Sequence, residues 1–218
     1  MAQSVGMTSR LLSRHAPNFQ LALPPRPLQP VSVISTPSPA CCGDDRPRIM
    51  DQRRTQSRFE ASEIFKGLYL GSWIDADSVD DLRRHGVTRI LNVAAECPVS
   101  SGCEQAAADG TMKVMKLELK DHSDEDISQH FAEAVEFMHD GIARNEGVLV
   151  HCRHGVSRSA TIVLAYLMRY GARDAAGDFV PMTYEDAFDY VKERRPFISP
   201  NLGFVLALRE VDRERVKP

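Results

Sequence analysis

Residues 148–161 read VLVHCRHGVSRSAT, and they pass from an apolar run through a polar loop into a helical segment that continues to Tyr170. A short, fully apolar run bounded by a loop is typical of a buried strand, and a strand that leads into a helix is typical of a layered α/β protein. Ligands of such proteins bind at the carboxyl ends of the strands. The sequence therefore predicts that Cys152 lies at a ligand-binding edge of a sheet.

The loop after Cys152 has a composition suited to binding one phosphate group. Five residues separate Cys152 from Arg158, enough to surround a tetrahedral oxyanion with backbone N–H groups, and the following helix adds the positive end of its dipole. Gly155 permits the positive φ or the close approach that a tight loop needs. Arg158 offers a planar fork for two phosphate oxygens, which lysine does not. The predicted phosphate-binding loop consists of Arg153, His154, Gly155, Val156, Ser157 and Arg158.

Cys152 is the candidate nucleophile of this loop. Inward amides, a helix end and a guanidinium favour the thiolate and can lower a cysteine pKa to ~3.5–7.5. The hydroxyls of Ser157 and Ser159 are placed to order the loop and to stabilise the thiolate as it leaves. A lone cysteine after an apolar strand is more often a small buried hydrophobe, but Gly155 and Arg158 in register favour catalysis. The chain has no GxxxxGK[ST] or GxGxxG motif, which argues against nucleotide binding.

From Arg58 onward, apolar runs alternate with segments of helical period. Because strands and helices of this length alternate, we expect an α/β sheet with both faces covered, in one domain over residues 58–215. Helices are predicted over 73–85, 127–144, 160–170 and 184–195, with a last one from about Pro200, and strands around Gly67 and over 87–93, 112–117 and 148–150.

The first 57 residues differ from the rest. They hold eight of the 13 prolines, and their seven Arg and three Asp give a net charge of +4, against 20 − 27 = −7 for the remaining 161 residues. Proline-rich runs sustain neither a helix nor an interior strand. We expect residues 1–57 to form a mostly disordered arm, with a cleavable transit peptide as the alternative.

The composition excludes several classes of protein. The net charge of the chain is 27 − 30 = −3, so we expect no nucleic-acid binding, and no run approaches ~18 apolar residues, so we expect no membrane span. Five cysteines without a CxxC pair argue against a disulfide framework or a structural zinc site. Reduced thiols favour a cytoplasmic location, with the nucleus or an organelle as alternatives.

The segment from His151 to Ser159 resembles the signature of cysteine-based protein phosphatases, and its surroundings resemble small, atypical members of the dual-specificity phosphatase family. The resemblance covers roughly residues 58–213. Further shared motifs are LGS at 70–72, ILNV at 90–93, YLM at 166–168 and PNLGF at 200–204.

The resemblance implies a mixed central sheet of about five strands with helices on both faces and the phosphate-binding loop between a strand and a helix. It implies hydrolysis through a phosphocysteine intermediate without a metal ion or another cofactor. It also implies supporting roles for His151, Asn92 and Asn201, with the two asparagines bracing the phosphate loop. A turn and a helix start would explain those asparagines equally well.

The leaving oxygen of a phosphate ester needs a proton, and residues 119–126, LKDHSDED, hold the candidate acids. In the family the acid lies on this loop, at a position that Asp121 matches best. Asp124 and Asp126 are expected to cap the following helix, and His122 to face solvent. The predicted catalytic residues are therefore Cys152, Arg158, Asp121 and Ser159.

Two segments depart from the family pattern. Residues 172–182 form a longer connection than usual, and their small, polar side chains predict a surface insertion, whose role the sequence leaves open. Residues 96–111 hold Cys97 and Cys103. Either thiol could oxidise against Cys152, although we expect a structural role for both.

These observations predict a dual-specificity protein phosphatase that hydrolyses phosphotyrosine and phosphoserine or phosphothreonine in proteins. The expected partners are phosphorylated proteins, with protein kinases among the candidates, and the oligomeric state is left open. One alternative is a phosphatase for a phosphoinositide, an RNA 5′-triphosphate or a glucan, although lipid-directed relatives usually carry a lysine that this loop lacks. The other is a module that captures phosphoproteins without turnover, against which the intact Cys152, Arg158 and Asp121 argue.

Overall fold

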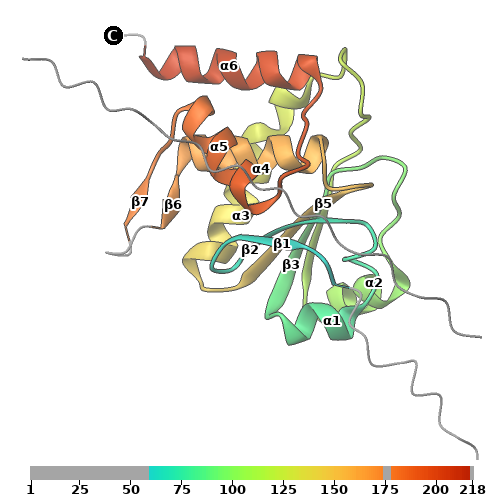
Figure 1. Cartoon of the computed structure of the whole chain (residues 1–218). Coiled ribbons are helices and arrows are strands. Elements are labelled where there is room, and N and C mark those ends of the chain that lie inside the picture. Colours follow the sequence, from blue (N-terminus) through green and yellow to red (C-terminus); the bar gives the residue numbers. More distant parts are fainter. Residues whose placement is uncertain (1–58, 174–177, 217–218) are drawn as a thin grey trace, which may run out of the picture. The chain divides into compact units, whose positions relative to one another are not determined.

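A mixed five-stranded sheet forms the centre of the domain in the computed structural model, which describes residues 59–173 and 178–216 (Figure 1). The strand order is β1-β2-β5-β3-β4; β1 pairs antiparallel with β2, and the other neighbours are parallel. The strands are Ser62–Phe65 (β1), Leu68–Ser72 (β2), Val87–Asn92 (β3), Lys113–Lys116 (β4) and Gly147–Cys152 (β5). The predicted mixed sheet is confirmed, and the predicted arm over 1–57 lies outside the described residues.

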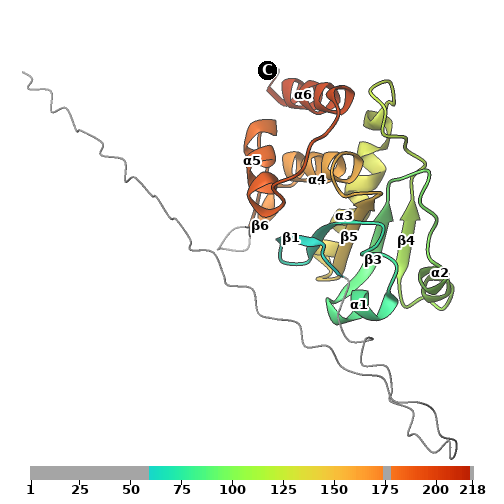
Figure 2. The same cartoon turned by 45° about the vertical axis from the view of Figure 1, so that its right-hand side comes forward.

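Helices cover both faces of the sheet (Figures 1 and 2). The first two helices pack on one face, against β3 and β4, and the third and fourth pack on the other face, while the last two lie against the fourth helix. The helices are Val79–Arg84 (α1), Ser101–Ala108 (α2), Phe131–Ala143 (α3), Arg158–Arg169 (α4), Tyr184–Arg194 (α5) and Leu202–Val216 (α6). Among the described residues, no helix is long and apolar enough to cross a membrane.

The central strands send alternate side chains into two core layers. Leu149 of β5 and Ile90 of β3 pack in the layer under α1 and α2, whereas Val148, Val150 and Leu91 pack in the larger layer under α3 and α4. Every residue of β5 is buried, as expected for a strand covered on both faces. The carboxyl end of β5 is therefore the point at which the chain leaves the buried sheet and enters the loop before α4.

The helix predicted over 73–85 is too long, because α1 begins only at Val79. The carboxylate of Asp75 accepts hydrogen bonds from the backbone N–H of Ser72 (2.7 Å), from its hydroxyl (2.8 Å) and from the N–H of Glu60 (2.6 Å). Such side-chain bonds compete with helix formation and hold this stretch in turns.

Three further elements differ from the prediction. The segment 96–111, for which no element was predicted, contains α2. The helix predicted over 127–144 begins with a 3₁₀ turn, Ile127–His130 (η2), before α3. Within the insertion 172–182, Ala172–Arg173 (β6) and Phe179–Val180 (β7) pair antiparallel as a small hairpin.

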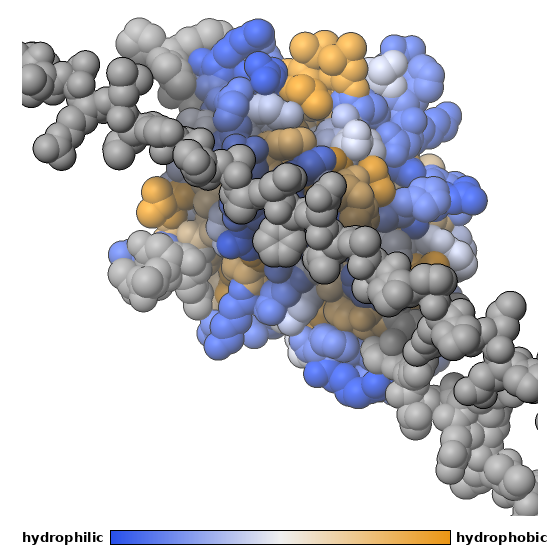
Figure 3. All heavy atoms as spheres, viewed as in Figure 1, coloured by the Kyte–Doolittle hydropathy of each residue, from blue (hydrophilic) through white to orange (hydrophobic). Residues whose placement is uncertain are grey.

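The last helix, α6, attaches to the domain through one apolar face. Phe204 and Leu208 are fully buried, while Leu202 and Leu206 are 70% and 56% exposed. In Figure 3, apolar side chains gather on the surface at one end of this helix. α6 is thus anchored by few large side chains.

Replacement of Phe204 by alanine should test this anchor. Because Phe204→Ala removes a buried ring, we expect the free energy of unfolding to fall by about 3–5 kcal/mol, measured by urea denaturation. The matched control is Leu206→Ala on the exposed side of the same helix, which should cost less than ~0.5 kcal/mol. Equal losses for the two variants would contradict the packing described for α6.

Candidate active site

Cys152 is the last residue of β5, and it stands between the ends of two parallel neighbours. Ser72 of β2 lies opposite Cys152, and Asn92 of β3 lies opposite His151. The loop 153–157 follows, and α4 begins at Arg158. The predicted strand–loop–helix arrangement is therefore present, with the loop at the carboxyl edge of the sheet.

The thiol of Cys152 is 2% exposed and is surrounded by hydrogen-bond donors. The N–H of Gly155 and the hydroxyl of Ser159 donate to Sγ over 3.3 and 3.2 Å. Burial alone would raise the pKa of this thiol, but the hydrogen bonds from Ser159 and from the backbone N–H groups of the loop outweigh it and lower the pKa below its ordinary value. Cys152 is thereby prepared to act as a nucleophile.

Gly155 cannot be replaced by a residue with a side chain. Its φ is +69°, and a Cβ at this position would lie 2.5 Å from the carbonyl oxygen of Gly71 and 2.5 Å from Nη2 of Arg195. The close approach predicted for this glycine is present, and it is made to the protein's own backbone behind the loop.

Arg158 is buried, and its guanidinium is held by Glu96. Nη1 and Nη2 each donate to one carboxylate oxygen of Glu96 over 2.6 Å, and Nη1 also donates to the Leu119 carbonyl (2.9 Å). Hydrogen bonding from Arg158 lowers the pKa of Glu96 to about 2, so the pair is ionised at neutral pH. The Nη1–Nη2 edge thus faces Glu96, while the buried Nε has no hydrogen-bond partner among the described residues.

Asp121 lies beside Arg158, with Oδ2 3.6 Å from Nε. Its other oxygen, Oδ1, accepts hydrogen bonds from the Ser157 hydroxyl (2.8 Å) and from Nδ2 of Asn201 (3.0 Å). Ser157 was expected to stabilise the thiolate, but its hydroxyl is directed to Asp121 instead. Cys152, Arg158 and Asp121 line one cavity of about 340 Å³ together with His154, Val156, Ser157, Ser199 and Asn201.

The remaining predicted residues of the site take different positions. Arg153 and His154 are exposed, and His122 faces solvent as predicted. Burial lowers the pKa of His151 to about 4, so its ring is neutral, with Nδ1 3.3 Å from the carbonyl oxygen of Cys152. Asn92 bonds to the backbone of its own loop, at Ala94 N and Cys97 O, and makes no hydrogen bond to the phosphate loop.

The two alternative acids also separate. Asp126 caps η2, because its carboxylate accepts from the N–H of Ser128. The expectation that Asp124 caps the same turn is wrong, since its exposed side chain contacts Ser123 and His122. Neither residue lines the cavity that contains Cys152.

Two residues at the site were missed by sequence reasoning, Glu96 and Arg195. Glu96 follows β3, whose end lies beside the end of β5, so the neighbouring strand places it next to Arg158. Arg195 follows α5 and donates hydrogen bonds to carbonyl groups of the phosphate loop. Neither residue belongs to a local sequence motif. The sequence offered only a charged residue next to an apolar segment, with no role predicted for that charge.

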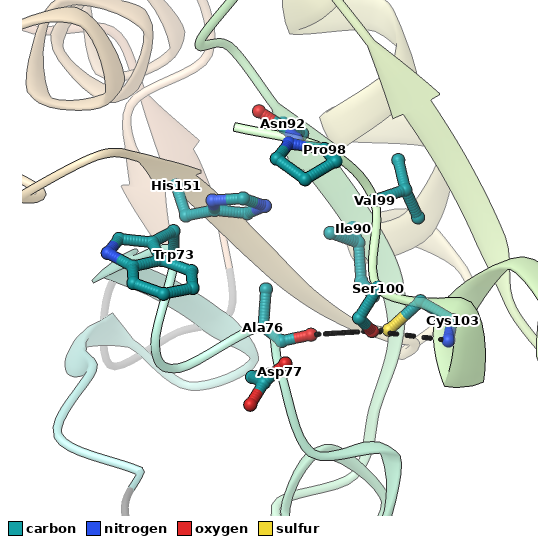
Figure 4. A pocket seen from close by; sticks show the side chains of 10 residues that line it. All are labelled: Trp73, Ala76, Asp77, Ile90, Asn92, Pro98, Val99, Ser100, Cys103 and His151. Atoms are coloured by element: carbon teal, nitrogen blue, oxygen red, sulfur yellow. Dashed lines mark hydrogen bonds between the residues drawn. The ribbon is translucent and has the colours of Figure 1, made fainter. Parts of the chain in front are cut away.

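Cys103 belongs to a different core layer from Cys152. It lines a separate cavity of about 60 Å³, where its thiol donates to the carbonyl of Ala76 (3.3 Å) and its N–H donates to Ser100 (Figure 4). Cys97 is buried in the same core layer as Cys152. Burial raises the pKa of both Cys97 and Cys103, so neither is activated. No group of three or more His, Cys, Asp or Glu within the described ranges is arranged to hold a metal ion.

Comparison with known proteins relates this site to one family. Residues 68–214 match the family model described as dual specificity phosphatase, catalytic domain. The chain is 38% identical over 157 residues to human dual specificity protein phosphatase 1, covering 72% of this chain and 38% of that protein. It is 34% identical over 151 residues to human dual specificity protein phosphatase 9, covering 69% and 36%. The chain thus spans little more than a third of these relatives' length.

Solved structures give the same relationship. The crystal structure of human DUSP28 matches with a TM-score of 0.60 and 27% identity, over 72% of this chain and 95% of that chain. The structure of the human tyrosine phosphatase-like serine/threonine/tyrosine-interacting protein matches with a TM-score of 0.57 and 32% identity, over 73% and 100%.

The hydroxyl of Ser159 should set the acidity of Cys152. Because Ser159→Ala removes a donor to Sγ, we expect the pH midpoint of Cys152 alkylation by iodoacetate to rise by about one unit, followed on the Cys152 peptide by mass spectrometry. A lowered pKa keeps the thiolate present at lower pH, so loss of the donor must move the midpoint upward. Ser101→Ala, at an exposed serine of α2, serves as the control, and an unchanged midpoint in Ser159→Ala would contradict the role given to this hydroxyl.

Proposed function

The chain belongs to the dual-specificity phosphatase family, and from this we propose that it hydrolyses phosphotyrosine and phosphoserine or phosphothreonine in protein substrates through a phosphocysteine intermediate. One observation carries the proposal: a thiol with a lowered pKa, a guanidinium whose Nε makes no hydrogen bond to any described residue, and a carboxyl group line the same cavity of about 340 Å³. These are the three groups that a phosphoryl transfer to sulfur requires.

Binding of the phosphate group uses donors that are already in place. Glu96 holds one edge of the Arg158 guanidinium, which leaves the Nε–Nη2 edge for two phosphate oxygens. Glu96 thereby fixes the orientation of the arginine before a substrate arrives. The N–H groups of the loop and the amino end of α4 supply further donors.

In the first chemical step the thiolate of Cys152 attacks phosphorus, the S–P bond forms and the P–O bond to the substrate breaks. The leaving oxygen takes the proton of Asp121, which lies beside Arg158 at the cavity wall. In the second step the carboxylate of Asp121 takes a proton from water as the water attacks phosphorus. Phosphate is released and the thiolate of Cys152 returns, stabilised by the hydroxyl of Ser159.

The class of substrate is decided by a direct comparison of turnover. We expect hydrolysis of a phosphotyrosine peptide and of a phosphothreonine peptide, measured as released phosphate, and little hydrolysis of a phosphoinositide. Faster turnover of the phosphoinositide, of an RNA 5′-triphosphate or of a phosphorylated glucan would contradict the protein substrate. Tight peptide binding without any release of phosphate would contradict the enzymatic function itself.

Replacement of Cys152 by serine should abolish hydrolysis while phosphopeptide binding and the fold are retained, because serine is nearly isosteric but does not ionise. Arg158→Lys should also be severely impaired, since a point charge cannot bind both Glu96 and two phosphate oxygens through planar edges. The measurement is the initial rate with an aryl phosphate, and circular dichroism serves as a control for folding. Appreciable turnover by Cys152→Ser would remove this residue from the mechanism.

Replacement of Asp121 by asparagine should reveal the general acid. Asp121→Asn removes the proton that the leaving group needs, so we expect kcat to fall by ~10²–10⁴-fold for a phosphoserine peptide, whose alkoxide leaves poorly. The loss should be smaller for an aryl phosphate with an acidic phenol. Asp124→Asn is the matched control, because its side chain is 86% exposed and lies outside the cavity. A leaving-group-dependent loss in the Asp124 variant alone would place the acid at that residue.

A further inference from the structure

Arg195 is a buried cation behind the phosphate loop. Its residue is 4% exposed, and each nitrogen of its guanidinium donates to a neutral oxygen. Nε donates to the carbonyl of Gly155 (2.8 Å), Nη2 to the carbonyl of His154 (3.4 Å) and Nη1 to the hydroxyl of Ser62 in β1 (3.1 Å). Arg195 thus connects the loop to the edge of the sheet.

These hydrogen bonds determine which way two peptide groups of the loop point. The structure contains no cis peptide bond among the described residues, and in a trans peptide the C=O and N–H point in opposite directions. The carbonyl of His154 is bound by Arg195, and the N–H of the same peptide group, which belongs to Gly155, donates to Sγ of Cys152. The carbonyl of Gly155 is bound in the same way, so the N–H of Val156 is turned away from Arg195 and toward the inside of the loop.

The charge of Arg195 has no carboxylate in ion-pair contact within the described part of the chain. The carboxylate of Asp75, which accepts its hydrogen bonds from neutral groups of Ser72 and Glu60, acts on Arg195 at longer range, and so does the Cys152 thiolate. A buried cation without a paired anion is costly unless an anion nearby offsets it. The anions that the proposed reaction brings to this place are the Cys152 thiolate and the substrate phosphate.

We propose that Arg195 is a positioning residue for the proposed phosphatase reaction: it aims the N–H groups of Gly155 and Val156 at the thiolate and the phosphate, and its charge stabilises both anions. The inference rests on the proposed function. In this proposal Arg195 acts by orienting the backbone of the loop, and it does not contact the substrate.

The neighbouring Arg194 offers a matched control. Its Nη1 donates to the carbonyl of Tyr190 (2.7 Å), its guanidinium stacks over the ring of the same residue, and its side chain is 33% exposed. It makes no hydrogen bond to the phosphate loop. Arg194 and Arg195 are therefore adjacent residues of the same type, but only Arg195 makes the hydrogen bonds to the phosphate loop on which the proposal depends.

The experiment compares Arg195→Met, Arg195→Lys and Arg194→Met in the full chain, with two readouts that do not need turnover. The first is the pH midpoint of Cys152 alkylation by iodoacetate, and the second is the Kd of inorganic vanadate. The other charged or titratable groups around Cys152 are unchanged in all three variants; among the described residues they include Glu96, Cys97, Asp121, His151, His154 and Arg158.

We expect Arg195→Met to raise the alkylation midpoint by about one pH unit and to weaken vanadate binding by about tenfold or more, since it removes two charge-assisted hydrogen bonds to the loop. Arg195→Lys should show a smaller change in the same direction, because it keeps the charge but loses the fork. Arg194→Met should match the wild-type chain in both readouts.

A wild-type midpoint and wild-type vanadate affinity in folded Arg195→Met would overturn the proposal, and so would equal changes in Arg194→Met. If Arg195→Met does not fold, Arg195→Lys decides, and unchanged values in that variant overturn the proposal. Both readouts are independent of the substrate class. A wild-type chain that binds vanadate but hydrolyses no phosphopeptide would therefore contradict the proposed function and leave the role of Arg195 measurable.

Discussion

The proposed reaction requires a negative charge on Cys152, a residue that is 2% exposed, where burial by itself favours the neutral thiol. The protein meets this constraint with neutral donors in contact with sulfur, the hydroxyl of Ser159 and the N–H of Gly155. A neutral donor is effective only when its N–H or O–H points at the acceptor. The site therefore depends on the direction of individual backbone groups, and the surrounding fold has to hold those directions.

The direction of the loop is held by closely packed backbone on its far side. Gly71 of β2 pairs with His151 of β5, and its carbonyl lies so near Gly155 that no side chain fits between them. The turn that follows β2 is held by Asp75 through Ser72, and its Trp73 N–H donates to a carbonyl of the loop. The late start of α1 at Val79, which the sequence prediction missed, leaves residues 73–78 to form this supporting turn. The positions of the hydrogen-bond donors around Sγ of Cys152 thus depend on the pairing of β2 with β5 and on the turn after β2.

The sequence indicated those parts of the site that are contiguous in the chain. The strand, the loop and the helix after Cys152 lie within one segment, so their residue types could be interpreted together. The residues that contact this segment from elsewhere in the chain could not be predicted, because only tertiary packing brings them next to it. Glu96 and Arg158 are 62 residues apart and meet only because β3 and β5 are neighbours in the sheet. Arg194 and Arg195 look alike in the sequence. At the end of α5, however, Arg195 is buried behind the phosphate loop, whereas the side chain of Arg194 is partly exposed.

In the proposed mechanism, the same packing determines which oxygen of Asp121 carries the proton. The hydroxyl of Ser157 accepts a hydrogen bond from the N–H of Asn201, so its own proton is directed to Oδ1 of Asp121. Nδ2 of Asn201 donates to the same oxygen, while Oδ1 of Asn201 caps the first turn of α6 at Phe204. With two donors on Oδ1, a protonated Asp121 carries its proton on Oδ2, the oxygen that lies beside Nε of Arg158. The anchoring of α6 in the core is in this way linked to the orientation of the Asp121 carboxyl group, although the helix begins beyond the residues that line the cavity.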